Sequence, residues 1–337
     1  MKKQRPIWAI VFGLLLTAYT AYVMLDVFVI KRPMQENAGG INLALFATTV
    51  TPTPTKKPPT PTPDNGTNPN PGGEVTPEPT ETPEVTPTPS WFSDEEIATD
   101  TMYKNDHLYI ELTEYREHST DIHVAEIRLS SAQYLLTAFA KDTYGRNILD
   151  KPTRIMPSKN AIFAVNGDNY GAREGGYVIR NGFLYRTTGN ARMDVMAIMP
   201  DGDFYFTHSK YITAQELLDM GAWQAFTFGP VLLDGGEFMV NPKSEVDLCY
   251  ATNPRTAIGM VEPLHYFVLV ADGRTAKSHG LSLYQVADLL KRLGCVKAYN
   301  LDGGGSSTMV FRGKVINFPT GDGTYYEREV SDIVYVR

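Results

Sequence analysis

A run of three glycines between an aspartate and two serines is the part of this sequence best suited to bind an anion. The segment reads Asn300-Leu301-Asp302-Gly303-Gly304-Gly305-Ser306-Ser307-Thr308. Glycine lets backbone N–H groups approach a ligand closely, and the neighbouring hydroxyl groups add hydrogen-bond donors. The Gly-Lys-Ser/Thr signature of nucleotide P-loops does not follow the glycines. We therefore expect an anionic or heavily hydroxylated ligand beside the carboxylate of Asp302.

Glycine runs are ordinarily flexible turns. Here the run lies between residues 296–300, which are predicted to form a short strand, and the apolar residues 309–311. A flexible loop between two buried strands is costly to order, because its conformational entropy is lost on folding. The context therefore favours a defined binding loop.

Three other turns carry polar side chains of the kinds that such a site needs. They are Asn166-Gly167-Asp168, Asn253-Pro254-Arg255-Thr256 and Asp272-Gly273-Arg274. An arginine binds phosphate through two parallel hydrogen bonds, and an aspartate can act as a base. Each turn also has an ordinary explanation, as a hairpin or Asp-Gly turn or as a surface arginine paired with an acid. No single turn is specific.

A serine hydrolase is the reaction class that the sequence argues against. Ser306 and Ser307 lack the Gly-x-Ser-x-Gly setting of a nucleophilic serine. The histidine nearest to them in sequence is His279, and a single histidine near a helix start is more often structural. We expect the serines to donate hydrogen bonds.

Taken together and in this order, five blocks of the sequence resemble the phosphodiester glycosidase family over residues 122–336. The blocks are Asn166-Gly167-Asp168, Phe228-Gly229-Pro230-Val231-Leu232, Pro254-Arg255-Thr256-Ala257-Ile258-Gly259, Asp272-Gly273-Arg274 and the glycine segment that ends at Thr308. The last block is the most specific. The resemblance implies a hydrolase that cleaves the bond between the anomeric carbon of a sugar and a phosphate, such as N-acetylglucosamine on a phosphodiester.

Carried over by position, the resemblance implies that these residues gather in one pocket. The implied catalytic residues are Asp302, Asp272, Arg255 and Asn166. The implied substrate-binding residues are Gly167, Asp168, Arg274, Asn300, Gly303, Gly304, Gly305, Ser306, Ser307, Thr308 and Arg328. The segment Asp168-Asn169-Tyr170 departs from the glycine and aromatic residues of many members, which leaves the shape of the sugar subsite open.

The chemistry of a glycosyl phosphate assigns roles to these residues. Its leaving group is a weakly basic anion, so cleavage needs charge stabilisation more than a general acid. We expect Arg255 and residues 303–307 to hold the phosphate, and Asp302 or Asp272 to act as nucleophile or to activate water. The sequence leaves open which aspartate does which. The alternative is a non-catalytic domain that binds a surface glycopolymer with the same loops.

Apolar runs predict the strands that must position these turns. They cover residues 122–129, 161–165, 195–199, 256–261 and 266–270. A helix with Ser282 as its N-cap is predicted to end at Gly294, and a weaker helix is predicted over residues 213–220. Because strands outnumber helices and do not alternate with them, we predict an α+β fold with a mixed, mainly antiparallel sheet and a few helices.

The chain before residue 91 differs in composition from the rest. Residues 7–30 are almost wholly apolar and long enough to form one transmembrane anchor. Lys31 and Arg32 partly cancel the positive charge of the N-terminus, but the Thr/Pro-rich segment that follows is typical of the outside of a cell, so we expect residues 1–6 in the cytoplasm. A cleaved signal peptide is the alternative, but the run is long and no convincing small-x-small cleavage site follows it. Residues 31–90 are expected to be a disordered, Thr/Pro-rich extracytoplasmic linker. Residues 91–337 then form the glycosidase-like domain at the cell surface, beside cell wall or exopolysaccharide.

Charge and cysteine content limit the remaining choices. The net charge is -7 and the lysines and arginines are scattered, so nucleic acid is not an expected partner. Cys249 and Cys295 either form one disulfide outside the cytoplasm or are two buried thiols. A calcium or magnesium ion would need Asp168, Asp272 and Asp302 to converge, whereas carboxylates at strand ends more often cap turns. We predict no cofactor and no metal.

Overall fold

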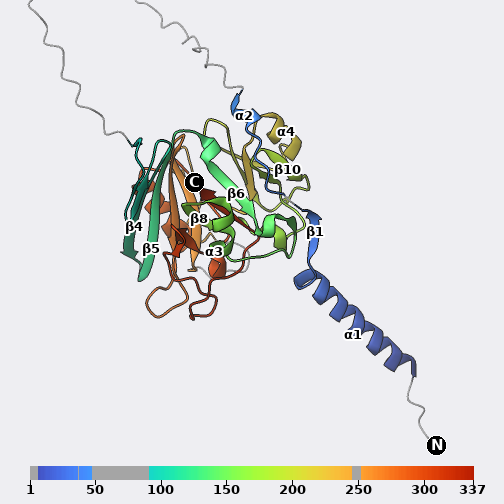
Figure 1. The fold of residues 1–337 in the computed structure, drawn as a ribbon. Helices are drawn as coiled ribbons and strands as arrows, with labels where there is room; N and C mark the ends of the chain where they lie inside the picture. Colours follow the sequence, from blue (N-terminus) through green and yellow to red (C-terminus); the bar gives the residue numbers. More distant parts are fainter. Residues whose placement is uncertain (1–6, 37, 48–90, 245–251) are drawn as a thin grey trace, which may run out of the picture.

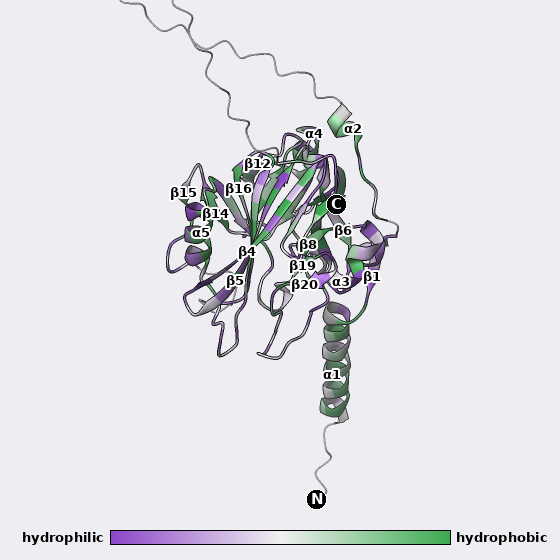
Figure 2. Cartoon of the chain, turned by 60° about the vertical axis from the view of Figure 1, so that its left-hand side comes forward, coloured by the Kyte–Doolittle hydropathy of each residue, from purple (hydrophilic) through white to green (hydrophobic). Residues whose placement is uncertain are grey.

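The structure is a computed structural model that describes residues 7–36, 38–47, 91–244 and 252–337 (Figure 1). A long helix, α1 (Ile7–Phe28), precedes a single folded domain in the chain and projects away from one side of it. The side chains of α1 are mostly apolar along its length (Figure 2). Among the described residues, every strand pairing is antiparallel.

The largest element of the domain is a nine-stranded sheet in the order β15-β14-β18-β16-β17-β5-β4-β3-β2. Its strands are β2 (Ile97–Ala98), β3 (Met102–Lys104), β4 (Leu108–Glu117), β5 (Thr120–Leu129), β14 (Val231–Asp234), β15 (Glu237–Phe238), β16 (Arg255–Glu262), β17 (His265–Ala271) and β18 (Lys297–Asn300). Buried and more exposed residues alternate along the first half of β4, which is typical of a sheet with one solvated face, whereas β5 is buried along most of its length.

Two five-stranded sheets complete the domain. One has the order β20-β19-β8-β21-β6, and the other has the order β10-β9-β13-β11-β12. Their strands are β6 (Leu135–Phe139), β8 (Phe163–Asn166), β9 (Val178–Arg180), β10 (Phe183–Arg186), β11 (Asp194–Ile198), β12 (Phe204–His208), β13 (Gln224–Thr227), β19 (Met309–Phe311), β20 (Lys314–Val315) and β21 (Asp332–Val336).

The nine-stranded sheet packs against the sheet that contains β8. Ile258 and Val268 on the first sheet and Val165 and Val334 on the second belong to one cluster of buried apolar side chains. Burial of such surface stabilises the packing of the two sheets by roughly 25 cal/mol per Å². The packing also brings the ends of β8, β16 and β18 together, and these are the strand ends from which the predicted site loops leave.

The N-cap that the sequence predicts, Ser282, is confirmed. Helix α5 (Leu283–Arg292) begins with a capping box between Ser282 and Gln285. Helix α4 (Ala214–Asp219) begins with the same arrangement, and α3 (Pro152–Ile155) is a single turn. In a capping box the side chains satisfy backbone N–H groups at the helix start.

The residues directly after α1 pair with the domain. Strand β1 (Arg32–Gln35) lies antiparallel to β7 (Tyr144–Arg146). Beside this pair, Nδ2 of Asn147 donates a 3.1 Å hydrogen bond to the carbonyl oxygen of Ile30. The domain is therefore held at the end of α1.

The next residues also contact the domain, so the first part of the predicted linker 31–90 has a different place from the one expected. Leu45 and Phe46, from the short helix α2 (Ala44–Ala47), pack on an apolar cluster, and the ring centroid of Phe46 lies 4.9 Å from that of Trp223. Leu45 and Phe46 are apolar and bury surface against this cluster. Thr and Pro residues of a spacer offer few apolar side chains that could do the same. Residues 48–90 lie outside the described part of the chain.

The predicted fold class, α+β with mainly antiparallel sheets, is confirmed. The six predicted strands correspond to β5, β8, β11, β16, β17 and β18, and the two predicted helices correspond to α5 and α4. Cys295 is buried, and Cys249 lies outside the described residues, so their pairing stays open. Burial raises the pKa of the Cys295 thiol to about 12.

Candidate active site

Asn166, at the end of β8, joins the turns that the sequence singled out. Its Nδ2 donates a 2.6 Å hydrogen bond to the carbonyl oxygen of Asp302, and its Oδ1 accepts from the Thr256 hydroxyl at 2.8 Å and the Thr308 N–H at 3.2 Å. The N–H of Asp302 donates to the carbonyl of Gly167 at 3.2 Å. Asn166 is only 1% exposed, so its amide orders the glycine loop from the protein side.

The glycines of residues 303–305, called the glycine loop below, are packed tightly. A Cβ atom on Gly303 would lie 2.8 Å from the carbonyl oxygen of Pro254, and one on Gly304 would lie 2.9 Å from Nη2 of Arg274. Gly304 also has a φ of +59°, in the left-handed region that favours glycine. The loop is therefore an ordered structure in which a side chain would displace its neighbours.

Two exposed arginines, Arg274 and Arg328, lie against the glycine loop. The guanidinium of Arg274 is held by hydrogen bonds of 2.9 Å to Oδ1 of Asn253 and 2.9 Å to the carbonyl of Gly321. Cδ and Nη1 of Arg328 lie 3.5 and 3.6 Å from the Cβ position of Gly305. Two guanidinium groups on the exposed side of an ordered loop form a suitable site for a phosphate.

The carboxyl group of Asp302 lies among these groups. Burial raises its pKa above the ordinary value, and hydrogen bonding with Ser306 and the charges of Arg328 and Arg173 oppose that rise. The N–H of Gly303 also donates to Oδ1 of Asp302 at 3.0 Å. A carboxylate whose pKa is shifted by burial and specific charges, beside an anion site, has the character of a catalytic group.

Arg173 is the residue near Asp302 that the sequence analysis missed. Its guanidinium lies 4.5 Å from the ring centroid of Phe228, and Nη1 donates to the sulfur of Met193 at 2.8 Å. Arg173 follows the short helix η4 (Tyr170–Ala172) and stands in no motif. The one signal for it is its position shortly after the Asn166-Gly167 turn.

Asp168 has a different place from the one expected of a substrate-binding residue. Nη2 of Arg180 donates to its Oδ1 at 2.8 Å, and the N–H of Thr227 donates to its Oδ2 at 2.9 Å. Asp332 accepts a second bond from Arg180, at 2.9 Å. All three charged side chains are 1% exposed. Both oxygens of Asp168 are thus used within a buried ion cluster.

This cluster lies directly beneath the Asn166-Gly167 turn. A side chain on Gly167 would collide with the carboxyl group of Asp332, and the N–H of Gly167 donates to the Asp332 carbonyl at 3.0 Å. Burial raises the pKa of Asp332 to about 7, with repulsion from Asp168 adding to the rise and Arg180 opposing it. Gly167 is required by this close packing.

Arg255 is buried behind the glycine loop rather than exposed beside it. Only 2% of its surface is exposed, and its Nε donates a 3.1 Å hydrogen bond to the carbonyl oxygen of Leu281. Its Cδ lies 3.9 Å from the Cβ position of Gly303. Arg255 therefore supports the loop at the place where Arg274 and Arg328 contact it from the exposed side.

Asp272 reaches the end of the glycine segment through Asn317. Its Oδ1 accepts hydrogen bonds from Nδ2 of Asn317 at 3.1 Å and from the N–H of Phe318 at 2.9 Å. The same amide of Asn317 donates to the carbonyl of Ser307 at 3.0 Å. The other oxygen, Oδ2, lies 3.6 Å from Nε2 of His123. Asp272 thus holds the loop indirectly.

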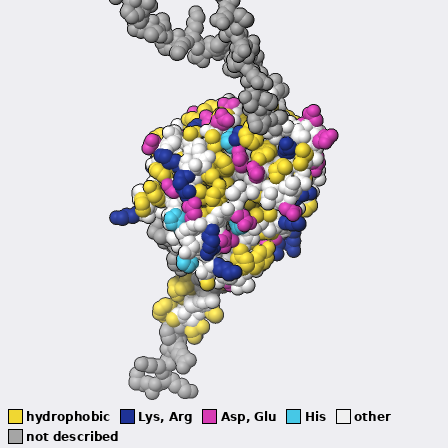
Figure 3. All heavy atoms as spheres, turned by 90° about the vertical axis from the view of Figure 1, so that its left-hand side faces the viewer, with side chains coloured by type: hydrophobic (Ala, Val, Ile, Leu, Met, Phe, Trp, Pro, Cys, Tyr) yellow, Lys and Arg dark blue, Asp and Glu magenta, His cyan; other side chains and the backbone are white. Residues whose placement is uncertain are grey.

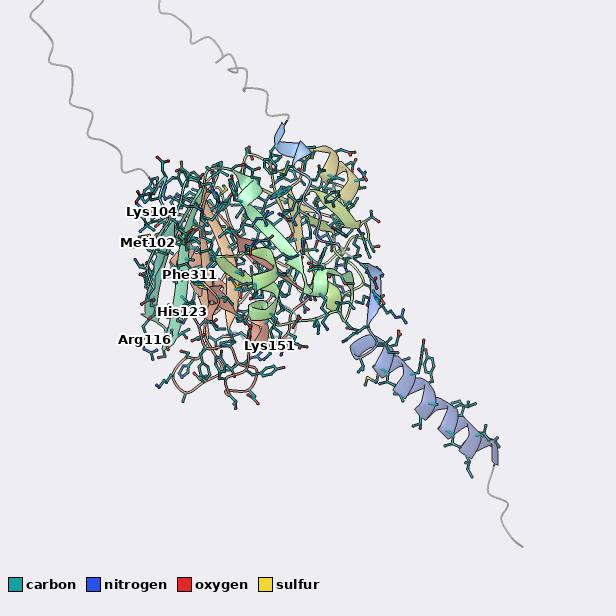
Figure 4. The ribbon with its side chains drawn as sticks, viewed as in Figure 1. Met102, Lys104, Arg116, His123, Lys151 and Phe311 are labelled. Atoms are coloured by element: carbon teal, nitrogen blue, oxygen red, sulfur yellow. The ribbon has the colours of Figure 1, made fainter. Side chains whose placement is uncertain are left out.

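Two cavities border Asp272. One of about 670 Å³ is also lined by Arg116 and His123, which Figure 4 shows at the lower ends of β4 and β5. The other, of about 460 Å³, is lined by residues that include Lys277 and Phe318. They leave room beside the site for parts of a ligand beyond its phosphate.

Asn300, Ser307 and Thr308 contribute buried polar atoms to the same segment. Oδ1 of Asn300, Oγ of Ser307 and Oγ1 of Thr308 have no hydrogen-bond partner among the described residues. Nδ2 of Asn300 donates to the carbonyl of Gly229 at 2.8 Å. Buried polar atoms are almost always paired in folded proteins, so these are atoms that a ligand or water would satisfy.

Within the described part of the chain, no group of three His, Cys, Asp or Glu side chains is placed to hold a metal ion. Asp168 binds Arg180, and Asp272 binds Asn317 and Phe318. Asp302 accepts from the N–H of Gly303, so the three aspartates considered for a cation have separate partners.

Comparison with known proteins identifies the family. A model described as phosphodiester glycosidase matches residues 159–337. A prophage-derived uncharacterised protein of Bacillus subtilis is 31% identical over 47% of this chain and 26% of its own length. Mouse N-acetylglucosamine-1-phosphodiester alpha-N-acetylglucosaminidase is 28% identical over 43% of this chain and 30% of its own length. The chain thus spans less than a third of these curated relatives.

A solved structure shows the same fold. The catalytic domain of the zebrafish N-acetylglucosamine-1-phosphodiester alpha-N-acetylglucosaminidase superimposes with a TM-score of 0.55 and 21% identity, over 68% of this chain and 82% of that one. The matched region contains the glycine loop, both exposed arginines and Asp302. On these grounds, the chain belongs to the phosphodiester glycosidase family.

Proposed function

We propose that this protein is a membrane-anchored hydrolase that cleaves a glycosyl-1-phosphodiester bond, in which a sugar is joined to phosphate through its anomeric carbon. The observation that carries the proposal is the placement of Asp302. Its carboxyl group, with a pKa raised by burial, lies beside the glycine loop and the charges of Arg328 and Arg173. The same site therefore offers a carboxylate for the sugar and cations for the phosphate.

The phosphate binds to Arg274 and Arg328 on the exposed side of the glycine loop. Arg274 is pre-positioned by its bonds to Asn253 and Gly321, so little side-chain entropy is lost when the phosphate arrives. Hydrogen bonds between a guanidinium and an anion are worth roughly 1.5–3 kcal/mol each. The same groups stabilise the phosphomonoester that leaves, because negative charge grows on it as the bond breaks.

Asp302 acts at the anomeric carbon of the sugar. A water oxygen or the carboxylate itself forms a bond to that carbon, while the bond from the carbon to the phosphate oxygen breaks and its electrons leave with the phosphate. In the direct route, Asp302 takes the proton of the water; in the two-step route, water then releases the sugar from Asp302. Both routes need Asp302 in its ionised form.

Asn166, Arg255 and Asp272 are positioning residues in this mechanism. Asn166 fixes the carbonyl of Asp302, and Arg255 supports Gly303 from behind. Asp272 holds Asn317, which holds Ser307. The loss of any one of them changes the geometry of the phosphate site, and a displacement of about 1 Å can cost on the order of 10²-fold in rate.

The N-terminal helix determines where the reaction takes place. One helix, with a candidate span of Trp8–Asp26, is long and apolar enough to cross a membrane. With residues 1–6 in the cytoplasm, the domain lies on the outer side of the cell membrane, within reach of glycans of the cell surface. The substrate is therefore a glycosyl phosphodiester of a surface glycan.

The test uses the full chain in detergent micelles, because Ile30, Arg32–Gln35, Leu45 and Phe46 contact the domain. It is offered methyl α-N-acetylglucosaminyl phosphate and a panel of other sugar-1-phosphodiesters, and released sugar is measured. Release from at least one member is expected. Saturable binding of a ligand that is recovered intact after long incubation would support the alternative, a non-catalytic glycan-binding domain.

A further inference from the structure

One wall of the site is the loop of residues 317–326, called the aromatic loop below. Its Gly321 lies over the glycine loop, with Cα 3.4 Å from the Cβ position of Gly305. The carbonyl of Gly321 accepts the 2.9 Å hydrogen bond from Arg274, and the N–H of Phe318 donates to Asp272. A surface that contacts the aromatic loop would therefore lie next to the phosphate of the proposed substrate.

The outer side of the aromatic loop presents three large rings to solvent. Phe318, Tyr325 and Tyr326 are 40%, 51% and 55% exposed. The loop is nevertheless ordered, since the rings of Phe318 and Tyr325 meet edge to face at 5.4 Å and the N–H of Tyr326 donates to the carbonyl of Pro319 at 2.9 Å. Clustered exposed rings on a defined loop mark a contact surface.

The aromatic loop lies on the side of the domain from which α1 leaves. Figures 1 to 3 are related by turns about the vertical axis, and in each of them α1 projects from the lower part of the domain, called the foot below. The red loop that follows β20 reaches the same foot in Figure 1. Lys151, labelled near the foot in Figure 4, has its Nζ 5.5 Å from the ring centroid of Tyr326.

The connection between α1 and the domain keeps this side close to the membrane. Only residues 29–31 separate α1 from β1, and β1 is paired with the domain. Three extended residues span at most about 10 Å. The foot of the domain therefore cannot move far from the end of the apolar helix.

From this arrangement we infer that the aromatic loop rests on the bilayer that α1 crosses, and that the sugar phosphate cleaved at the glycine loop is esterified to a membrane lipid. Tyrosine rings are enriched at the membrane interface, and the charge of Lys151 beside Tyr326 suits the phosphates of lipid headgroups. A lipid-borne phosphodiester would reach Arg274 without leaving the bilayer surface. The inference rests on the proposed function and names its substrate class.

The exposed rings could instead stack on the sugar of the substrate. Two substrates with the same reacting bond distinguish membrane contact from sugar stacking. One is the α-N-acetylglucosaminyl phosphodiester of hexadecanol, placed in the same phosphatidylglycerol-containing nanodisc as the full chain. The other is the water-soluble methyl phosphodiester. The double variant Tyr325→Ser/Tyr326→Ser is compared with the wild type on both, with Tyr211→Ser, an exposed tyrosine in the loop before α4, as the control.

We expect the wild type to cleave the lipid-borne substrate at least tenfold more efficiently than the soluble one. The double variant loses about tenfold on the lipid-borne substrate and keeps its activity on the soluble one, and Tyr211→Ser changes neither. An equal loss on both substrates assigns the rings to sugar stacking and overturns the inference. So does wild-type cleavage of the soluble substrate alone. Cleavage of neither substrate counts against the proposed function.

A second measurement tests the membrane contact without any turnover. In a Cys249→Ser background, Tyr325→Cys and Asp234→Cys are each labelled with a nitrobenzoxadiazole fluorophore in the full chain, and Cys295 is protected by burial. Nanodiscs that contain spin-labelled phospholipid should quench the label at position 325 and leave the label at position 234 bright. Equal fluorescence at the two positions would contradict the contact, whatever the activity.

Discussion

The side-chain amide of Asn166 donates a 2.6 Å hydrogen bond to the carbonyl oxygen of Asp302. One side chain thus joins the turn after β8 to the turn after β18, which lie in different sheets. The same amide group accepts a hydrogen bond from Thr308, beyond the glycines. The geometry of the glycine loop therefore depends on a residue 136 positions away in the chain.

Replacing Asn166 with alanine should destabilise the domain as well as slow the reaction. The variant leaves the Asp302 carbonyl, the Thr256 hydroxyl and the Thr308 N–H without this partner, and an unsatisfied buried polar group costs roughly 1–3 kcal/mol. The melting temperature in detergent should fall by several degrees. Asn241→Ala, at an exposed position, should leave it nearly unchanged. Equal melting temperatures for the two variants would show that Asn166 does not hold the loop.

Gly304 and Gly235 form a matched pair, because their φ angles are +59° and +58°. Alanine costs both positions about 1 kcal/mol for the left-handed backbone. At Gly235 the new Cβ meets nothing within 4 Å, whereas at Gly304 it lies 2.9 Å from Nη2 of Arg274. Gly304→Ala should therefore lower kcat/KM at least tenfold, and Gly235→Ala should not. The account of Arg274 is wrong if both variants keep full activity.

Arg274→Lys keeps the positive charge and removes the planar guanidinium with its paired N–H donors. The loss of this guanidinium should weaken phosphate binding by roughly 1.5–3 kcal/mol, which lowers kcat/KM about 10–150-fold. The measurement is steady-state turnover of the soluble phosphodiester. The exposed Arg192→Lys is the control and should change kcat/KM less than twofold. Full activity in Arg274→Lys would show that the guanidinium of Arg274 does not bind the phosphate.

The pH dependence of the reaction should report the raised pKa of Asp302. Because Asp302 must be ionised, kcat/KM rises with pH through that pKa, and its midpoint should lie above the ordinary aspartate value of about 3.9. The charge of Arg328 lowers this pKa. Arg328→Gln should therefore move the midpoint to higher pH, while Arg192→Gln leaves it in place. A shift to lower pH would exclude Asp302 as the titrating group.

The sequence predicts the local parts of this structure well. The capping boxes of α4 and α5 and the apolar runs of the predicted strands depend on neighbours within a few residues, and all of them are found. The glycine loop is recognisable because Gly304 requires a positive φ and close contacts that other residues do not tolerate. Such positions require glycine, so they can be recognised from the sequence.

The orientation of charged side chains depends on contacts with residues far away in the chain, so it could not be predicted from the sequence. Asp168 belongs with Arg180 and Asp332, which lie in other strands, and Arg255 faces Leu281. Arg173 reaches the neighbourhood of Asp302 without a motif of its own. The packing of Arg32–Gln35 and of Phe46 on the domain was missed for a similar reason, since Phe46 contacts Trp223 far along the chain.

The most direct test of the account is the turnover of the soluble phosphodiester by Asp302→Asn, which keeps the shape of the side chain and removes its charge. We predict a loss of about 10²–10⁴-fold in kcat with the fold intact. Asp234→Asn, an exposed aspartate on β14, is the matched control and should retain wild-type turnover. Wild-type turnover by folded Asp302→Asn would contradict the central claim that Asp302 performs the chemistry.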